Sequence, residues 1–361
     1  MRRIILILII LFCFPFNVLA SENQPEVYAQ GAVLMEYETG RVLWQKNMNE
    51  ELPMASTTKI MTAILALESG KLDDVTEASA KAAAAPKVHM GLSKGEKHRL
   101  YDLLYPLMLM SANDSAVVIA EHIGGSVEGF ADMMNSKARE IGAVHTEFVT
   151  PNGLDKDNHH STAYDMALIS RYALGNDEFV KIINTPSITI PLKNGDEKSY
   201  SLYNKNRLLN EYDGAIGVKT GFTGKAGNCF VGAAKRDGME LITVVLASGW
   251  GSAGKERKWS DTKAMLNYGF DNFKKVKIMD AGMDMGKVQV LYSKEGFVNT
   301  KTAGEGYAYL SDEEIKGLKT VYDLKESVEA PVNINDVLGK AEVYTAQGEK
   351  LFETDQSRRI Q

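Results

Sequence analysis

The order in which strand-like and helix-like segments follow one another limits the possible folds of this chain more than any other feature. Strand-like runs at 32–37 and 42–44 flank Thr39-Gly40 and predict a hairpin. Helical periodicity then dominates as far as about residue 174, and strand-like runs return from Ser187 onward. Early and late strands with helices between them, rather than strict alternation, predict an α+β domain: a helical cluster on an antiparallel sheet.

Several segments between and after these strands carry apolar residues at helical spacing. The predicted helices cover about 56–69, 100–110, 115–123, 127–141, 163–174 and 260–268. Pro106 lies inside the second helix and is expected to kink it, and Thr162 with Asp165 resembles a capping box at the start of the fifth. The late strand-like runs are expected to form one sheet covered by the last helix; they are 188–190, 216–219, 229–231 and 241–246.

After about residue 275 the sequence consists of short strand-like runs, with turns at Glu305-Gly306 and Gln347-Gly348. This pattern predicts a small all-β domain at 276–361 that follows a larger domain at 21–275. Two domains are also expected because about 340 residues are too many for one ordinary core.

The first twenty residues have the features of a secretory signal peptide. Arg2 and Arg3 precede an apolar run, which ends in small residues at Ala20. We therefore expect an exported protein, cleaved after Ala20, and no later stretch is long and apolar enough to cross a bilayer. Removal of two arginines changes the net charge from -6 to -8, which gives no indication of nucleic-acid binding. Cys229 is then the remaining cysteine, and its strand-like surroundings favour a buried small side chain over a catalytic thiol.

Three short motifs stand in order along the chain. They are Ser56-Thr57-Thr58-Lys59, Ser111-Ala112-Asn113 and Lys219-Thr220-Gly221. Each motif alone is weak, because such short combinations occur often by chance. The set is informative because of the order of the motifs and their predicted contexts. These contexts are a helix start, a link between helices, and a strand before a glycine-rich turn.

The first motif fits nucleophilic catalysis. Residues three apart lie on one face of a helix, so the amine of Lys59 can reach the hydroxyl of Ser56. A serine needs a base to become a nucleophile, and a lysine can serve if burial and a second positive charge, here Lys219, lower its pKa. Because Ser56 begins a predicted helix, its own N–H can form half of an oxyanion hole.

The other two motifs supply groups for a peptide substrate. Ser111 can pass a proton to a departing amine, and Asn113 can hydrogen-bond to Lys59 and to a substrate amide. Lys219 and Thr220, on an expected edge strand, can hold a terminal carboxylate while the peptide pairs alongside. Gly221 leaves room for that approach. Further charge near the carboxylate could come from four basic residues that the sequence does not rank: Lys205, Arg207, Arg257 and Lys258.

The stretch 32–270 resembles the low-molecular-weight penicillin-binding proteins that act as D-alanyl-D-alanine carboxypeptidases. The likeness extends through four segments, which are 52–62, 111–117, 151–155 and 217–223. It implies a β-lactamase/transpeptidase-like catalytic domain and a serine-type hydrolase without a cofactor. That enzyme removes the terminal D-alanine from peptidoglycan stem peptides through an acyl-enzyme on Ser56, and β-lactams are its covalent inhibitors.

The same resemblance implies further roles. The N–H of Phe222 would complete the oxyanion hole, and His160 and Asp165 match a family stretch to which we assign a structural role. His159 and His160 are adjacent, so they point in different directions, and no metal site is predicted. The C-terminal region resembles the β-rich domain of the family. Members held at the membrane carry a further amphipathic helix, which is not found at 358–361, so peripheral association with the outer face of the membrane is left open.

Three other functions are compatible with part of this pattern. A class A β-lactamase needs a glutamate in an E-x-x-L-N loop, and Glu147 is followed by Phe-Val-Thr-Pro instead, so slow release of penicillin is expected. A DD-endopeptidase that cuts peptidoglycan cross-links uses the same chemistry and is hardly separated by sequence. A non-catalytic peptidoglycan-binding protein is disfavoured because the motif side chains are all intact.

Overall fold

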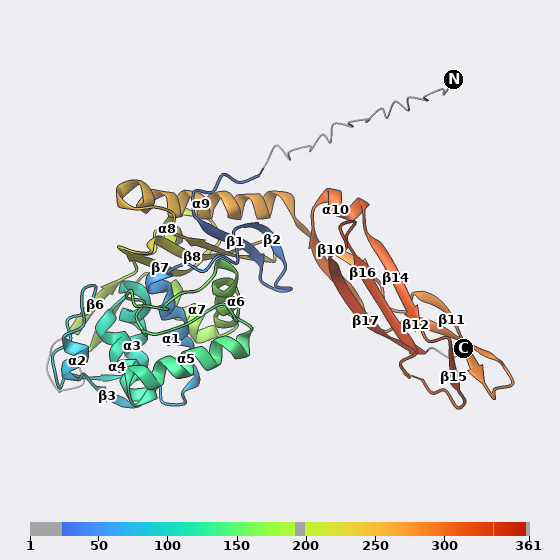
Figure 1. The fold of residues 1–361 in the computed structure, drawn as a ribbon, viewed down its shortest axis with the longest axis horizontal. Coiled ribbons are helices and arrows are strands. Elements are labelled where there is room, and N and C mark those ends of the chain that lie inside the picture. Colours follow the sequence, from blue (N-terminus) through green and yellow to red (C-terminus); the bar gives the residue numbers. More distant parts are fainter. Residues whose placement is uncertain (1–23, 192–198, 335, 359–361) are drawn as a thin grey trace, which may run out of the picture.

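The computed structural model describes residues 24–191, 199–334 and 336–358. The predicted signal peptide therefore lies outside the described residues. Figure 1 shows two parts, a body of helices and sheet and an elongated β domain, which meet near the end of helix α9. The α+β architecture with a following all-β domain, predicted from the order of elements, is confirmed.

A five-stranded antiparallel sheet, in the order β2-β1-β9-β8-β7, forms the centre of the first part. Its strands are β1 (Gly31–Glu36), β2 (Val42–Lys46), β7 (Ala215–Thr223), β8 (Gly227–Arg236) and β9 (Met239–Leu246). The predicted hairpin of β1 and β2 is confirmed, and the early strand pairs with a late one through Val33 and Val244. Strand β7 lies at one edge, so one side of its backbone is open to a ligand.

The expectation that 188–190 belongs to this sheet is wrong. Strand β5 (Ser187–Pro191) pairs with β6 (Ser199–Tyr203) in a separate two-stranded sheet. In β5 only Ile190 is fully buried, whereas all eight residues of β8 from Gly227 to Ala234 are buried. A strand with one buried side chain suits a surface hairpin and not the centre of a domain.

The helices cover the two faces of the central sheet (Figure 1). Most lie on one face: α1 (Lys59–Glu68), α2 (Ala80–Ala83), α3 (Leu100–Tyr105), α4 (Asn113–Gly124), α5 (Val127–Ile141), α6 (Ala163–Leu174) and α7 (Asp177–Asn184). Alternate side chains of β1 point to opposite faces. Val33 and Met35 join the core under these helices, while Leu34 joins a second core under α9 (Gly251–Asn272). There Trp259 packs against Phe230, with ring centroids 4.7 Å apart.

Several predicted helices have different ends in the structure. A 3-10 turn (Ala55–Thr58) precedes α1, and a π-helical turn (Pro106–Met110) follows α3, so Pro106 interrupts the regular helix as expected. Helix α9 starts nine residues before the prediction, because its glycine-rich and charged first turns lack an apolar period. The structure also contains β3 (Val75–Glu77), β4 (Lys97–Arg99) and α8 (Leu208–Glu211).

Thr162 caps α6 as predicted, and its hydroxyl accepts a hydrogen bond from the N–H of Asp165 at 3.0 Å. The prediction that the side chain of Asp165 completes the capping box is wrong. The carboxylate of Asp165 instead accepts from the N–H of His145 and the hydroxyl of Thr146, both at 2.7 Å. Asp165 therefore has the structural role that was expected, but it fixes the preceding loop.

The C-terminal part is a six-stranded sheet in the order β14-β16-β17-β12-β11-β15, beside the pair β10-β13. Its elements are β10 (Lys274–Met279), β11 (Asp284–Leu291), β12 (Phe297–Thr302), β13 (Gly306–Leu310), α10 (Asp312–Lys316), β14 (Lys319–Leu324), β15 (Ser327–Glu329), β16 (Gly339–Tyr344) and β17 (Lys350–Arg358). Among the residues that the structure describes, no helix is long and apolar enough to cross a membrane.

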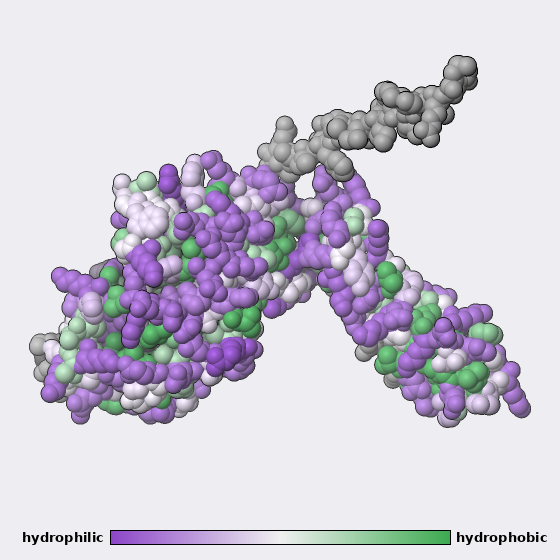
Figure 2. All heavy atoms as spheres, viewed as in Figure 1, coloured by the Kyte–Doolittle hydropathy of each residue, from purple (hydrophilic) through white to green (hydrophobic). Residues whose placement is uncertain are grey.

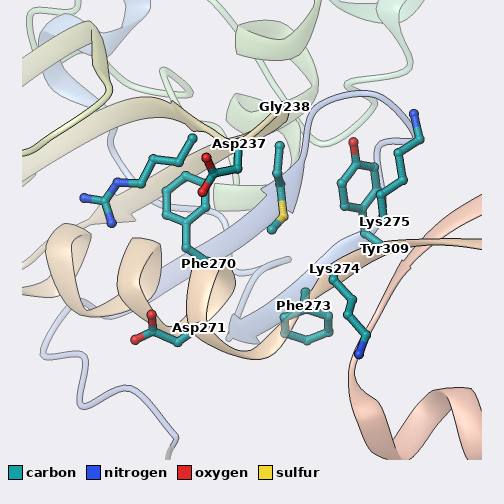
Figure 3. Close-up of a pocket in the computed structure, with 10 residues that line it drawn as sticks. Asp237, Gly238, Phe270, Asp271, Phe273, Lys274, Lys275 and Tyr309 are labelled. Atoms are coloured by element: carbon teal, nitrogen blue, oxygen red, sulfur yellow. The ribbon is translucent and has the colours of Figure 1, made fainter.

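Charged side chains of the β1–β2 turn join the two parts. Arg41 donates to the carbonyl of Tyr309 at 2.7 Å and forms ion pairs with Glu314 and Glu349. Glu38 accepts from Lys275 and from the hydroxyl of Tyr309. A hollow of about 580 Å³ lies at this junction. Figure 3 shows side chains that line it, among them Phe270, Phe273 and Tyr309. None of the three sequence motifs contributes to its lining, so it is separate from the site described next.

Candidate active site

Ser56 lies in a tight turn whose geometry is set by its neighbours. Ala55 adopts a positive φ of 49°, a conformation that costs energy for a residue with a Cβ. The hydroxyl of Thr58 donates to the carbonyl of Ala55 at 2.8 Å, and that of Thr57 donates to Met54 at 2.7 Å. These bonds hold the strained turn at the start of α1 and leave the side chain of Ser56 half-buried.

Lys59 lies one helical turn beyond Ser56 and is completely buried. Its Nζ is 3.0 Å from Oγ of Ser56, 2.8 Å from Oδ1 of Asn113 and 2.5 Å from the carbonyl oxygen of Asn152. Burial, and after it the positive charge of Lys219, hold the pKa of Lys59 well below its usual value. The neutral amine, which a general base requires, is thereby favoured.

The partners of Lys59 also fix where its lone pair points. Asn152 offers a carbonyl, which can only accept, and the amide of Asn113 is oriented because its Nδ2 donates to the carbonyl of Pro86 at 2.9 Å. A neutral amine has two N–H groups and one lone pair. The two N–H groups match the two acceptors, and the lone pair is left for the hydroxyl proton of Ser56.

The second motif lies where a π-helical turn meets α4. Ser111 adopts a left-handed conformation with φ 66°, and its Oγ is buried without a hydrogen-bond partner among the described residues. The N–H of Asn113 donates to the carbonyl of Val88 at 2.8 Å. Next to it, the buried carboxylate of Asp114 accepts from three consecutive N–H groups, at 90–92. The motif is held rigidly while the Ser111 hydroxyl stays available.

Lys219 is the fifth residue of β7, rather than its last, and is almost completely buried. Burial, and next the charges of Lys258 and Lys205, lower its pKa to about 7. Of the four basic candidates, Lys258 and Lys205 are therefore the two whose charges act on Lys219. The other two are engaged elsewhere, because Arg207 pairs with Glu211 and Glu256 while Arg257 stacks on Tyr28.

The remaining predicted residues follow Lys219 along the edge strand. Thr220 is half-buried, and its carbonyl accepts from Nζ of Lys219 at 3.0 Å. Gly221 lies against the first motif, since a Cβ there would come within 3.0 Å of the Ser56 nitrogen. Phe222 is 55% exposed, so its ring is largely open to solvent. The strand therefore places its backbone directly beside Ser56.

Sequence reasoning missed the contribution of the segment 151–155. The carbonyl of Asn152 contacts Lys59, and Gly153 packs on Ala55. In the sequence, this segment stands out only as part of the resemblance to the family. A contact made by a main-chain carbonyl leaves no side-chain signal.

The histidine beside the site is His159 and not His160. His159 is buried; its Nδ1 accepts from the N–H of Val149 at 2.9 Å, so its Nε2–H donates to the hydroxyl of Thr58 at 3.0 Å. Burial lowers the pKa of His159 to about 4, so it stays neutral. His160 is partly exposed near Glu51.

Cys229 is fully buried in β8, and burial raises the pKa of its thiol to about 11. The prediction of a buried small side chain is confirmed, and a thiolate nucleophile at this position is disfavoured.

Comparison with known proteins decides the family. Residues 19–249 match the model of the family described as D-alanyl-D-alanine carboxypeptidase, and residues 273–355 match the penicillin-binding protein 5 C-terminal domain. A curated relative, the D-alanyl-D-alanine carboxypeptidase DacF of Bacillus subtilis, is 36% identical over 90% of this chain and 84% of its own length. The chain belongs to the D-alanyl-D-alanine carboxypeptidase family.

Other members of this family agree over most of the chain. The carboxypeptidase DacD of Escherichia coli is 30% identical over 95% of this chain and 91% of its own. The crystal structure of penicillin-binding protein 5 from Haemophilus influenzae superposes with a TM-score of 0.76 at 29% identity. The superposed region covers 93% of this chain and 97% of the Haemophilus influenzae chain. The expected penicillin-binding fold with its second β domain is thereby confirmed.

Proposed function

We propose that this chain is a serine-type D-alanyl-D-alanine carboxypeptidase that cleaves the terminal D-alanine from peptidoglycan stem peptides through an acyl-enzyme on Ser56. The observation that carries the proposal is the 3.0 Å separation of the Lys59 amine and the Ser56 hydroxyl, with both other acceptors of the amine fixed. Family membership supports the same activity.

In the acylation step, Oγ of Ser56 attacks the carbonyl carbon of the penultimate D-alanine while its proton passes to the neutral amine of Lys59. The backbone N–H groups of Ser56 and Phe222 are assigned to the oxyanion that develops. Ser111 passes the proton to the departing amine of D-alanine. Water then hydrolyses the ester, which restores Ser56 and releases the shortened peptide.

Binding of the terminal carboxylate is assigned to Lys219 and Thr220, with Lys205 and Lys258 adding positive charge behind them. A peptide that pairs with the open edge of β7 would present its last peptide bond to Ser56, since Gly221 lies beside that residue. Asn113, whose Oδ1 accepts from Lys59, is also assigned to bind a substrate amide.

Mass spectrometry after incubation with penicillin tests this proposal. We expect one stable adduct on the peptide that contains Ser56, no adduct in Ser56→Ala, and an unchanged adduct in Ser136→Ala, which alters an exposed helical serine. Rapid turnover of the drug without a lasting adduct would instead indicate a β-lactamase. The described residues include no glutamate that hydrogen-bonds to Ser56 or Lys59, so slow release is expected.

The carboxypeptidase is preferred to an endopeptidase because the curated relatives bear that name. A pentapeptide and a cross-linked dimer should be assayed side by side. Release of D-alanine from the pentapeptide is the expected result, and cleavage of the dimer alone would overturn the preference. A folded protein that is inert on both substrates would favour a non-catalytic peptidoglycan-binding role.

We also propose that the chain is exported, with cleavage after Ala20, and that 21–275 and 276–361 are separate domains. N-terminal sequencing of the secreted protein tests the first point. Helix α9 ends at Asn272, and β10, which pairs with β13 of the C-terminal part, begins at Lys274; this supports a boundary at Phe273, close to the proposed one. Proteolysis that yields two folded fragments from this region would support the boundary, and one indivisible fragment would argue against it.

Peripheral association with the outer face of the membrane is proposed for the far end of the C-terminal domain, where Figure 2 shows apolar side chains gathered. The exposed apolar residues there lie at the joined ends of β11 and β12, in the turn between these strands and in the loop before β16; they are Leu291, Phe297, Tyr292, Ile334 and Val337. Such exposed groups suit an interface with lipid. The purified protein should sediment with vesicles, and a Tyr292→Ser, Phe297→Ser double variant should not.

A further inference from the structure

A hydrogen bond beside the candidate active site joins two segments that both pack on Ser56. The hydroxyl of Thr223, the last residue of β7, donates to Oδ1 of Asp155 at 2.7 Å. The N–H of Lys225 lies 3.4 Å from the other carboxylate oxygen. The hydroxyl of Thr223 in turn accepts from the N–H of Ala226 at 3.0 Å. A single exposed carboxylate therefore holds the end of β7 and the turn that follows it.

The segment that carries Asp155 is itself anchored to the first motif. The hydroxyl of Thr62, on α1, donates to the carbonyl of Pro151 at 2.6 Å. The next carbonyl, that of Asn152, accepts from Lys59, and Gly153 would bring a Cβ within 2.9 Å of the Ser56 nitrogen. The position of this segment is thus fixed by the helix that carries the nucleophile and the base.

The end of β7 is less firmly held without this contact. Beyond Gly221 its residues pair only with β8 on one side, since β7 is an edge strand. The other tie on the turn comes from Trp250, whose Nε1 donates to the carbonyl of Gly224 at 2.8 Å. Asp155 links the end of β7 to the segment 151–155, which packs on the Ser56 turn.

We propose that Asp155 and Thr223 form a latch that sets the distance between the N–H of Phe222 and the Ser56 turn, and so aligns the oxyanion hole. Asp155 is a positioning residue, because it acts through the backbone of β7. This inference rests on the proposed function, since it concerns the same acylation step. Transition-state stabilisation by two N–H donors requires both at hydrogen-bond distance from one oxygen, so a displaced strand end lowers the rate more than it lowers substrate binding.

The test uses the full mature chain, labelled penicillin for the acylation rate constant, and a D-Ala-D-Ala pentapeptide for kcat and KM. Asp155→Ala and Thr223→Val should each lower the acylation rate constant and kcat about tenfold while KM changes by less than about twofold. The double variant should be about as slow as the slower single variant, because both substitutions break the same Asp155–Thr223 hydrogen bond. Thr223→Ser keeps the hydroxyl and should retain the wild-type rate.

Asp157→Ala is the matched control. Asp157 is also an exposed aspartate, and it lies two residues after Asp155. Its substitution should leave the rates and the melting temperature unchanged. The latch is disproved if Asp155→Ala acylates as fast as the wild type, if the two losses multiply in the double variant, or if melting temperature falls in parallel with the rate. Failure of the wild type to be acylated at Ser56 would instead reject the proposed function, so the two failures are distinguishable.

Discussion

Gly153 packs on Ala55 so closely that a Cβ at position 153 would lie 1.9 Å from the carbonyl oxygen of Ala55. Gly153 also has a φ of +81°, in the region where side chains are strained. Ala55 is itself strained, with a positive φ, and it immediately precedes Ser56. Two unusual backbone conformations thus meet where the nucleophile is presented.

Gly153→Ala should therefore displace the Ser56 turn. Since the clash is with main-chain atoms, no side chain can move to relieve it, and a displacement of about 1 Å can cost a hundredfold in rate. We expect at least that loss in penicillin acylation, measured by stopped-flow fluorescence. Gly238→Ala, in the turn between β8 and β9, shares the positive φ (83°) but has no atom within 4 Å of the added Cβ, so it separates backbone strain from the clash. Equal losses in both variants would contradict the explanation.

Lys59→Met should remove the general base while filling the same buried space. General-base catalysis contributes about 10²–10⁴-fold, so the acylation rate constant should fall by that factor. The carbonyl of Asn152 and the amide of Asn113 would lose their shared donor, so circular dichroism is needed to show that the variant is folded. A folded Lys59→Met with more than a tenth of the wild-type rate would mean that another group takes the proton.

The pairing of Ser56 with Lys59 could be predicted because it depends only on helical spacing, which is a local property. The helix 127–141 and the cap at Thr162 were predictable for the same reason. Cys229 could be assigned to the core because its whole segment is apolar. These predictions need no knowledge of which segments meet in space.

Contacts between distant segments were not predictable. Asn152 contributes a main-chain oxygen, which every residue has, so its sequence carries no signal for that contact. Lys258 reaches Lys219 from α9, and only the packing of α9 on the sheet brings the two charges together. The wrong placement of 188–190 has the same origin, because strand propensity does not specify a partner.

Lys219 should make the stability of the protein depend on pH. Its pKa is lowered from 10.5 to about 7 by burial and neighbouring charge, so between these values the unfolded chain binds more protons than the folded one. The free energy of unfolding contributed by this group then rises with pH, by at most about 1.4 kcal/mol per pH unit. Lys219→Met lacks this dependence and should be inactive.

The measurement is urea unfolding of wild type and Lys219→Met at pH 7 and pH 10. The free energy of unfolding of the wild type, minus that of Lys219→Met, should be larger at pH 10 than at pH 7. Lys181→Met, which alters an exposed lysine, should show no such change relative to wild type. A difference that is constant from pH 7 to pH 10 would mean that Lys219 titrates normally in the folded protein.

Arg41 should hold the C-terminal domain at a fixed orientation. Its side chain is 10% exposed and joins the β1–β2 turn to three groups of the other domain, the carbonyl of Tyr309 and the carboxylates of Glu314 and Glu349. Arg41→Ala removes all three contacts and leaves two acidic groups without that partner, whereas Lys274→Ala removes an ion pair with Asp312 that is exposed to solvent and therefore weak. Small-angle scattering should show a wider range of interdomain distances for Arg41→Ala and an unchanged profile for Lys274→Ala. Both variants should keep the wild-type rate of penicillin acylation, because Ser56 lies in the core of the first domain. An unchanged profile for Arg41→Ala would assign the domain orientation to the apolar packing of Tyr309 instead.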